Sequence, residues 1–297
     1  MGFMNRLATA PISWGICEVP GWGVQLPVDR VLSEMAQAGF TATELGSEGY
    51  LPSDPTELAS VLSTHDLSLL AAFVPVLVHD PSQADETLRR CEEMAGLLQR
   101  VGATYFNSSP VTTWDWGPRR ELTTAEWDHT WQMFDRIEEI TEAHGLTQVL
   151  HEHVGTIVET KDEIQRTVDN SSIRFVLDTA HFAVGGYDPL EFAENHADRV
   201  GLVHIKDCDL AKAAMLNNGE LSLMEAVQQG LFPNVGRGDL DIGGVIESLE
   251  GKGYDGWYVL EQDAAITGDE PPAGKGPIED VLENVNYLRD LEASLAA

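Results

Sequence analysis

The chain has 297 residues, 43% of them hydrophobic, and 49 acidic against 18 basic side chains give it a formal net charge of −31. This charge repels nucleic-acid phosphates and anionic lipid surfaces, so both are disfavoured as partners. No apolar run reaches the roughly 18 residues of a membrane-spanning helix, and the N-terminus lacks the apolar core of a signal peptide. The three cysteines follow no disulfide or metal spacing, and together these features predict a cytoplasmic protein.

Strand-like and helix-like segments alternate along the chain. The expected strands cover residues 7–12, 41–46, 68–74, 103–107, 146–151, 173–178, 200–206 and 256–261. The expected helices cover residues 27–38, 55–65, 83–101, 123–144, 160–169, 188–197, 241–252 and 277–295. Eight strand-then-helix units without a linker predict a single-domain (β/α)8 TIM barrel over residues 1–297. An open doubly wound sheet is disfavoured, because no G-x-G-x-x-G motif follows the first strand.

Two segments interrupt this alternation. Residues 207–240 are expected to form a long loop after the seventh strand, and we expect it to cover the mouth of the barrel as a lid. Residues 266–276 are rich in Gly and Pro and predict a surface loop before the last helix. Arg237, one of few cations, is a candidate for binding a substrate hydroxyl or carboxylate; the alternative is an exposed loop residue without a role.

Polar side chains gather at the C-terminal ends of six expected strands. In a TIM barrel these ends converge on one mouth, where active sites lie. A single polar residue at a strand end is usually a helix cap or a loop anchor, but such residues at six ends favour a functional site. The residues are Glu44, Asn107, His151, Glu152, His153, Asp178, His181, His204, Lys206 and Glu261.

The chemistry of this set predicts a divalent metal site. Carboxylates and imidazoles without thiolates suit manganese, cobalt, magnesium or zinc with exchangeable positions, and such an ion acidifies the C–H next to a carbonyl. Lys206 follows His204 by two residues and shares its strand face. A cation nearby would lower its ammonium pKa and suit it to proton transfer. The alternative for Lys206 is a structural ion pair with Asp207 or a neighbouring carboxylate.

Residues 175–207, FVLDTAHFAVGGYDPLEFAENHADRVGLVHIKD, resemble the central block of the xylose-isomerase-like TIM barrels, which include sugar isomerases, epimerases and endonuclease IV. The resemblance implies that Asp178 and His204 are metal ligands and that His181 lines the site. The sequence GYDGWYVLEQD at 253–263 resembles the eighth-strand motif of the same superfamily, which implies that Glu261 is the last ligand.

Within this superfamily the chain looks most like the inosose dehydratase group. The likeness covers nearly the whole chain and rests on APISWG, AGFTATELG, H-x-H-x-G-T and G-x-G-D-x-D, at residues 10–15, 38–46, 151–156 and 236–241. It implies dehydration of 2-keto-myo-inositol or a similar cyclic keto-polyol, with manganese as the expected ion and cobalt, magnesium or zinc as alternatives. Trp14 and Asn107 are then candidates for substrate binding.

The fifth strand departs from the superfamily pattern. Most members carry a ligand Glu there, in an E-N-H-x-G motif, and alignment on His153 and Gly155 places His151 at the ligand position. Strand alternation puts His151 and His153 on one face and Glu152 on the other, which favours His151 as ligand. A bulge at the strand end would bring in Glu152 instead, so both residues remain candidates.

The residues support a hypothesis for the reaction. His153 or Glu44 removes the α-proton of the ketone, and Lys206 or His181 protonates the departing β-hydroxyl. A metal-dependent isomerase or epimerase of a keto-sugar is one alternative, including the metal-bearing subunit of an enzyme that cleaves 3-keto-glycosides. A non-catalytic sugar-binding barrel is another, and an endonuclease-like enzyme is disfavoured by the acidic charge. The sequence leaves open whether the chain forms a homo-oligomer.

Overall fold

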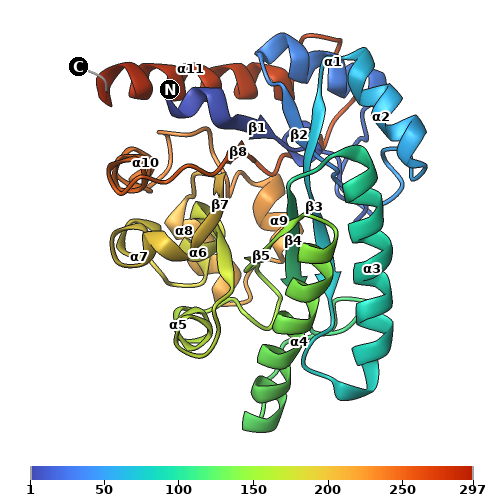
Figure 1. Cartoon of the computed structure of the whole chain (residues 1–297). Coiled ribbons are helices and arrows are strands. Elements are labelled where there is room, and N and C mark those ends of the chain that lie inside the picture. The colour runs from blue at the N-terminus through green and yellow to red at the C-terminus, as the bar shows by residue number, and fades with distance from the viewer. Residues whose placement is uncertain (1, 296–297) are drawn as a thin grey trace.

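Short apolar segments form the strands of the structure, a computed structural model that describes residues 2–295 (Figure 1). The strands are β1 (Leu7–Thr9), β2 (Ala42–Glu44), β3 (Ser68–Val76), β4 (Tyr105–Pro110), β5 (Thr147–His151), β6 (Arg174–Asp178), β7 (Val200–Ile205) and β8 (Tyr258–Leu260). Neighbours pair in parallel in chain order, and the barrel closes because β8 pairs with β1, with Ala8 opposite Val259. This confirms the prediction of a single-domain (β/α)8 barrel.

Helices surround the barrel and follow the expected segments closely. They are α1 (Val28–Ala38), α2 (Pro55–Thr64), α3 (Ala84–Val101), α4 (Thr124–Ala143), α5 (Lys161–Asn170), α6 (Thr179–Val184), α7 (Pro189–His196), α8 (Leu210–Asn217), α9 (Leu223–Gln228), α10 (Ile242–Gly251) and α11 (Pro277–Leu295). Of these, α6, α8 and α9 were not expected, because they are too short to show a helical period in the sequence. None of the helices within residues 2–295 has the length and apolar character needed to cross a membrane.

Local signals in the sequence explain where several helices begin. The Asp54 carboxylate accepts hydrogen bonds from the backbone N–H groups of Thr56 and Glu57 at 3.0 and 2.9 Å, and Pro55 occupies the first turn of α2. At the start of α4, Thr123 and Glu126 form a reciprocal capping box. These caps satisfy N–H groups that lack a partner within the helix, so the helix starts are fixed independently of the barrel.

Side-chain alternation along the strands divides the interior into a barrel lumen and a layer between strands and helices. We call the part of the lumen farther from the C-terminal mouth the lower level and the part at the mouth the upper level. The lower level is lined by small and apolar side chains: Ala8, Ala10, Ala42, Leu70, Ala71, Tyr105, Val149, Val176, Leu202 and Val259. The next inward position on six of these strands, two residues later, is polar. These six positions hold Glu44, Asn107, His151, Asp178, His204 and Glu261. The strand period therefore brings the polar residues to one level at the C-terminal mouth.

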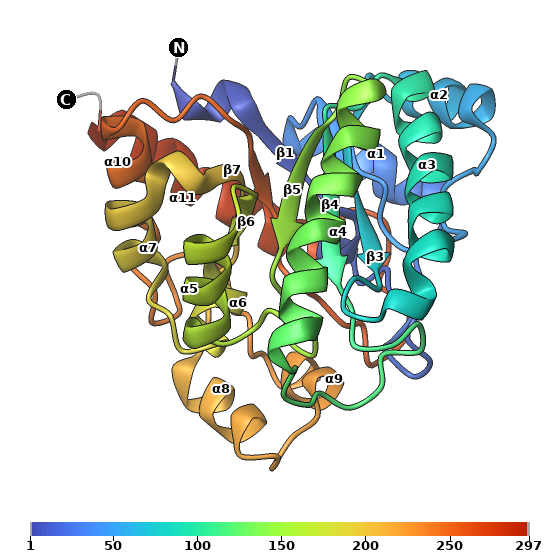
Figure 2. The same cartoon turned by 60° about the horizontal axis from the view of Figure 1, so that its bottom comes forward.

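Residues 207–240 were expected to form a long loop, but they contain α8 and α9 (Figure 2). The buried Asp207 carboxylate organises the end of this segment, because it accepts hydrogen bonds from the backbone N–H groups of Cys208, Gly236, Gly238 and Leu240. A Cβ at position 238 would lie 2.2 Å from an Asp207 oxygen, which explains the glycine there. Residues 266–276 contain no helix or strand.

Candidate active site

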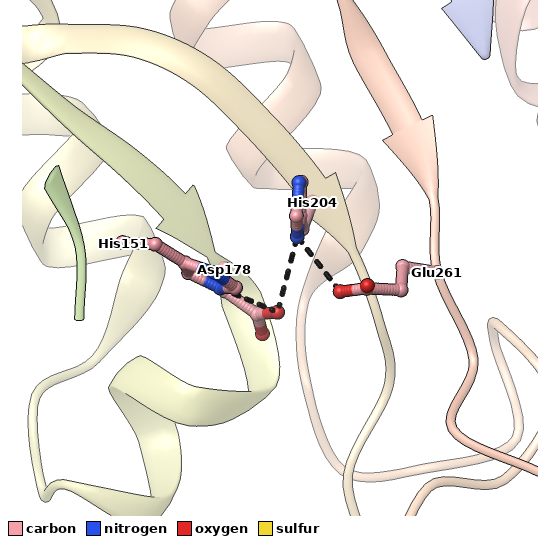
Figure 3. A group of neighbouring side chains, drawn as sticks. All are labelled: His151, Asp178, His204 and Glu261. Atoms are coloured by element: carbon pink, nitrogen blue, oxygen red, sulfur yellow. Dashed lines mark hydrogen bonds and ion pairs between the residues drawn. The ribbon is translucent and has the colours of Figure 1, made fainter. Parts of the chain in front are cut away.

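A group of four side chains lies at the C-terminal mouth of the barrel: His151, Asp178, His204 and Glu261. One nitrogen or oxygen atom from each lies within 4.8 Å of the others (Figure 3). His204 Nδ1 lies 2.7 Å from Glu261 Oε2 and 3.7 Å from Asp178 Oδ2, and His151 Nε2 lies 3.7 Å from the same Asp178 oxygen. Three of the four are fully or almost fully buried, and the Glu261 side chain keeps an exposure of 12%.

The donor set of this group fits a divalent cation. Two imidazoles and two carboxylates at the ends of four different strands, without a thiolate, are typical ligands of manganese, cobalt or zinc. Within residues 2–295, neither ring nitrogen of the buried His151 has a hydrogen-bond partner. Because a buried polar group without a partner is destabilising, this imidazole indicates that the site binds a ligand.

Lys206 links the group to a third carboxylate. Its Nζ lies 2.7 Å from Asp263 Oδ1, 3.2 Å from Glu261 Oε2 and 3.3 Å from Asp178 Oδ2. Burial by itself would lower the pKa of Lys206, but the three carboxylates raise it well above its usual range. Asp207 is not the partner, because its oxygens bind backbone N–H groups.

Two further histidines lie beside this lysine. The rings of His153 and His181 are 4.0 Å apart between centroids, and His181 Nε2 is 3.5 Å from Lys206 Nζ. His153 Nδ1 lies 2.8 Å from the Val154 carbonyl oxygen, which can only accept, so Nδ1 carries the proton and Nε2 is a free acceptor. Burial is the main cause that lowers the pKa of His153 to about 4, which keeps the ring neutral near pH 7.

Glu44 and Asn107 complete the inner side of the site. Glu44 Oε1 accepts hydrogen bonds from Asn107 Nδ2 at 2.7 Å and from His204 Nε2 at 3.0 Å, and both residues are buried. Since the other nitrogen of His204 faces Glu261 and Asp178, Glu44 fixes the orientation of this ring. The Glu44 carboxylate already accepts hydrogen bonds from two side chains, so Glu44 is placed to orient these neighbours.

Glu152 lies outside the four-residue group. Strand β5 pairs with β6 through His151 without a register shift, so the alternation that directs His151 inward holds to the strand end. Glu152 is fully buried, and neither carboxylate oxygen has a hydrogen-bond partner among the described residues. Burial raises the pKa of Glu152 well above its usual range. The geometry therefore agrees with the parity argument that favours His151.

The structure does not bring Trp14 and Arg237 to the site. A short 3-10 turn over Pro11–Trp14 ends the strand alternation, and the Trp14 indole is buried in the outer layer, where Nε1 donates to Glu34 Oε2 at 2.9 Å. The Arg237 side chain is 66% exposed and pairs with Glu283 on α11. In both cases a hydrogen-bond or ion-pair partner outside the barrel lumen holds the side chain away from the site.

Two residues that the sequence did not indicate contact the site. Asp263 follows Glu261 by two positions, a spacing that could have suggested it, and it is the nearest carboxylate to Lys206 Nζ. Phe232, from the segment 207–240, lies with its ring centroid 5.7 Å from that of His181 and 5.1 Å from Lys206 Nζ. No sequence pattern links Phe232 to the strand ends, because its position depends on how the segment folds.

Comparisons with known proteins identify the family. The model of the xylose isomerase-like TIM barrel family matches residues 32–291. Inosose dehydratase of Geobacillus kaustophilus (strain HTA426) is 34% identical over 275 residues, covering 88% of this chain and 89% of that protein. The rhizopine catabolism protein MocC of Rhizobium meliloti is 32% identical over 272 residues, covering 86% and 81%. A crystal structure of the IolI protein with a bound zinc atom matches with a TM-score of 0.69 at 16% identity, covering 97% and 98% of the two chains. The chain belongs to the xylose isomerase-like TIM barrel family.

Proposed function

We propose that this sugar-modifying enzyme is a metal-dependent dehydratase that acts on a cyclic keto-polyol of the inosose type. The observation that carries the proposal is the four-residue group beside a neutral histidine and a buried lysine, His153 and Lys206. These are the groups needed to remove a proton next to a carbonyl and to protonate a leaving hydroxyl. The relatives named inosose dehydratase support the substrate class.

His151, Asp178, His204 and Glu261 would hold the divalent ion, and Glu152 is the alternative to His151 on the fifth strand. Manganese is our first choice of ion, with cobalt, magnesium and zinc as alternatives. When bound, the ion supplies Lewis acidity, which polarises the substrate carbonyl and acidifies the C–H beside it. Glu44 supports this set by accepting from His204 Nε2.

His153 is our choice for the base. Its Nδ1 proton is held by the Val154 carbonyl at 2.8 Å, so Nε2 keeps a free lone pair for the α-proton of the ketone. Glu44, the alternative base, already accepts from Asn107 and His204, and protonating it would weaken both hydrogen bonds.

Lys206 is our choice for the acid. It donates a proton to the β-hydroxyl, the C–O bond breaks with both electrons leaving on oxygen, and water departs. The electron pair of the α-C–H bond forms the second bond of the new C=C. Solvent takes the proton from His153 and returns one to Lys206, so the reaction loses one water and changes no oxidation state overall. His181, the alternative acid, has an Nδ1 without a hydrogen-bond partner in the described chain.

We also propose that the segment 207–240 covers the mouth during the reaction. Phe232 from this segment contacts His181 and Lys206, and Figure 2 shows α8 and α9 together below the barrel. An apolar cover limits the access of water to the reacting carbon and strengthens the electrostatic interactions beneath it.

The proposal is tested by incubating the protein with 2-keto-myo-inositol and manganese in D2O and following the products by NMR. A dehydratase gives an enol or diketone that has lost water, whereas an isomerase or epimerase gives a deuterated product of unchanged formula and contradicts the proposal. Asp178→Asn should abolish the reaction, and Glu283→Gln, a matched change at a half-exposed residue of α11, should leave it intact. Dehydration by Asp178→Asn at the wild-type rate would contradict the metal site.

A further inference from the structure

Two aromatic rings lie beside the group on the side of β3 and β4. Phe73 of β3 and Trp116, in the loop between β4 and α4, have centroids 6.1 Å apart and an interplanar angle of 14°. His153 meets both rings edge-on, at 5.7 and 5.8 Å between centroids. The aromatic pair therefore adjoins the histidine that we propose as the base.

Trp116 is held in an unusual conformation. Its φ of 56° lies in the left-handed region, which costs energy for a residue with a bulky side chain, and its surface is 40% exposed. The Trp116 N–H donates to the Thr113 carbonyl at 3.0 Å, and the Gly117 N–H donates to Thr113 Oγ1 at 2.6 Å. A tight turn thus keeps a large apolar ring at the surface instead of burying it.

An ion-pair network connects this loop to the loop that carries His153. Arg119 donates to Glu159 Oε2 at 2.8 Å and to Glu163 Oε1 at 2.8 Å. The same Glu159 oxygen accepts the Gly155 N–H at 2.6 Å. Because Glu159 is shared, the loop with Trp116 and the loop with His153 are held to one another, and the aromatic pair is ordered before any ligand binds.

Strand β4 adds polar atoms next to Phe73. Asn107 pairs across the sheet with Phe73, and Ser109 lies two residues further along the same face. Both side chains are fully buried, and Asn107 Oδ1 and Ser109 Oγ have no hydrogen-bond partner within residues 2–295. Since Asn107 Nδ2 reaches Glu44, this face of β4 is directed toward the four-residue group. The unpartnered atoms are available for hydroxyl groups of a ligand.

We propose that Phe73, Trp116, Asn107 and Ser109 form a binding site for a saturated polyhydroxylated ring. One C–H face of the ring packs on Trp116, and its hydroxyls bind Ser109 Oγ and Asn107 Oδ1. An open-chain polyol with as many hydroxyls has no fixed C–H face, and it loses more conformational freedom on binding. The site therefore selects rings over open chains. This inference rests on the proposed function, because it defines the substrate class of the same site.

The test compares binding of myo-inositol and sorbitol, which have equal numbers of carbons and hydroxyls but differ in ring closure. NMR-detected titration of the manganese-loaded protein should show tighter binding of myo-inositol. Trp116→Ala should weaken myo-inositol binding about tenfold and sorbitol binding much less, which removes the preference. Trp116→Phe should keep most of it. Ser109→Ala should weaken myo-inositol binding about threefold to tenfold, the loss of one hydrogen bond.

Trp131→Ala is the matched control, since Trp131 stacks on Trp127 within α4, and it should bind both polyols as wild type does. The inference is overturned if wild type shows no preference for the ring, or if Trp116→Ala keeps the preference. Neither result depends on turnover. Trp116-dependent ring binding without dehydration contradicts the proposed function alone, whereas dehydration with an unchanged ring preference in Trp116→Ala contradicts this inference alone.

Discussion

The lower and upper levels of the barrel lumen are built by the same strands and differ in chemistry. At the lower level, Val176 and Leu202 are apolar and buried, and they belong to the same hydrophobic cluster. Two residues later, Asp178 and His204 are equally buried but ionisable. Burial of apolar surface stabilises the fold, whereas burial of ionisable groups stabilises it only when partners compensate for lost hydration. The lower level thus serves stability, and the upper level carries the groups that we propose for the chemistry.

The first test of this comparison removes the Lys206 ammonium, which lies among the carboxylates of the upper level. Lys206→Met should lower kcat about 1,000-fold, because it removes the proposed acid. The control is Lys212→Met, since Lys212 pairs with Asp209 in the same part of the chain and has no proposed role. Steady-state kinetics with 2-keto-myo-inositol measure both. A Lys206→Met enzyme with near-wild-type kcat would assign the acid to another residue, with His181 as the next candidate.

A substitution at the lower level should have the opposite effect, because it should lower the stability of the fold and leave the activity nearly unchanged. Leu202→Ala removes a fully buried side chain from the lumen and should lower the free energy of unfolding by about 3 kcal/mol. The kcat/KM per folded molecule should stay within about twofold, because no reacting group moves. Urea denaturation and kinetics below the unfolding transition measure the two effects. Loss of activity without loss of stability would contradict the division between the levels.

Manganese should stabilise the folded protein, because it compensates the buried charges of the upper level. At an ion concentration of about 100 times Kd, the gain in unfolding free energy should be about 2.7 kcal/mol. His151→Ala should remove most of this gain, and Glu152→Gln should leave it. Thermal unfolding with and without the ion measures the difference, and the reverse pattern in the two variants would make Glu152 the fifth-strand ligand.

Asp263 should have a smaller effect than Lys206, because it contacts the Lys206 ammonium and is not one of the groups that we propose to exchange protons with the substrate. We expect Asp263→Asn to lower kcat about tenfold with KM little changed, as expected when a catalytic group loses its orienting partner. Asp263→Glu should restore part of the loss. An increase in KM with unchanged kcat would instead indicate contact with the substrate.

The smallest effect is expected for Phe232, which belongs to the segment 207–240 that we propose as a cover of the mouth. Phe232→Ala should raise KM about threefold to fivefold, because the ring packs on His181 and the Lys206 ammonium and makes no hydrogen bond through its side chain. Leu210→Ala is a suitable control, since this residue of α8 is 44% exposed. Equal effects of the two changes would argue against a specific role of Phe232.

Much of the fold could be predicted because its signals are local. Alternating apolar segments, Pro at helix starts and Asp or Thr caps lie within a few residues of the elements they define, as at Asp54 and Thr123. Asp178, His204 and Glu261 could be named because parallel strands bring their C-terminal ends together. Trp14 and Arg237 were misplaced because a 3-10 turn and a partner on α11, respectively, direct them elsewhere.

The sequence by itself determined the barrel, the level of its polar residues and the chemical kind of ligand that they suit, since all three follow from strand period and residue type. Tertiary structure alone decided which groups face one another: Asp263 on Lys206, Trp116 on Phe73, and Phe232 on His181. These pairs join residues far apart in the chain. The spacing of Asp263 from Glu261 gives a signal for the first pair, but the contacts of Trp116 and Phe232 depend on loop conformation and helix placement, for which neither periodicity nor spacing carries a signal.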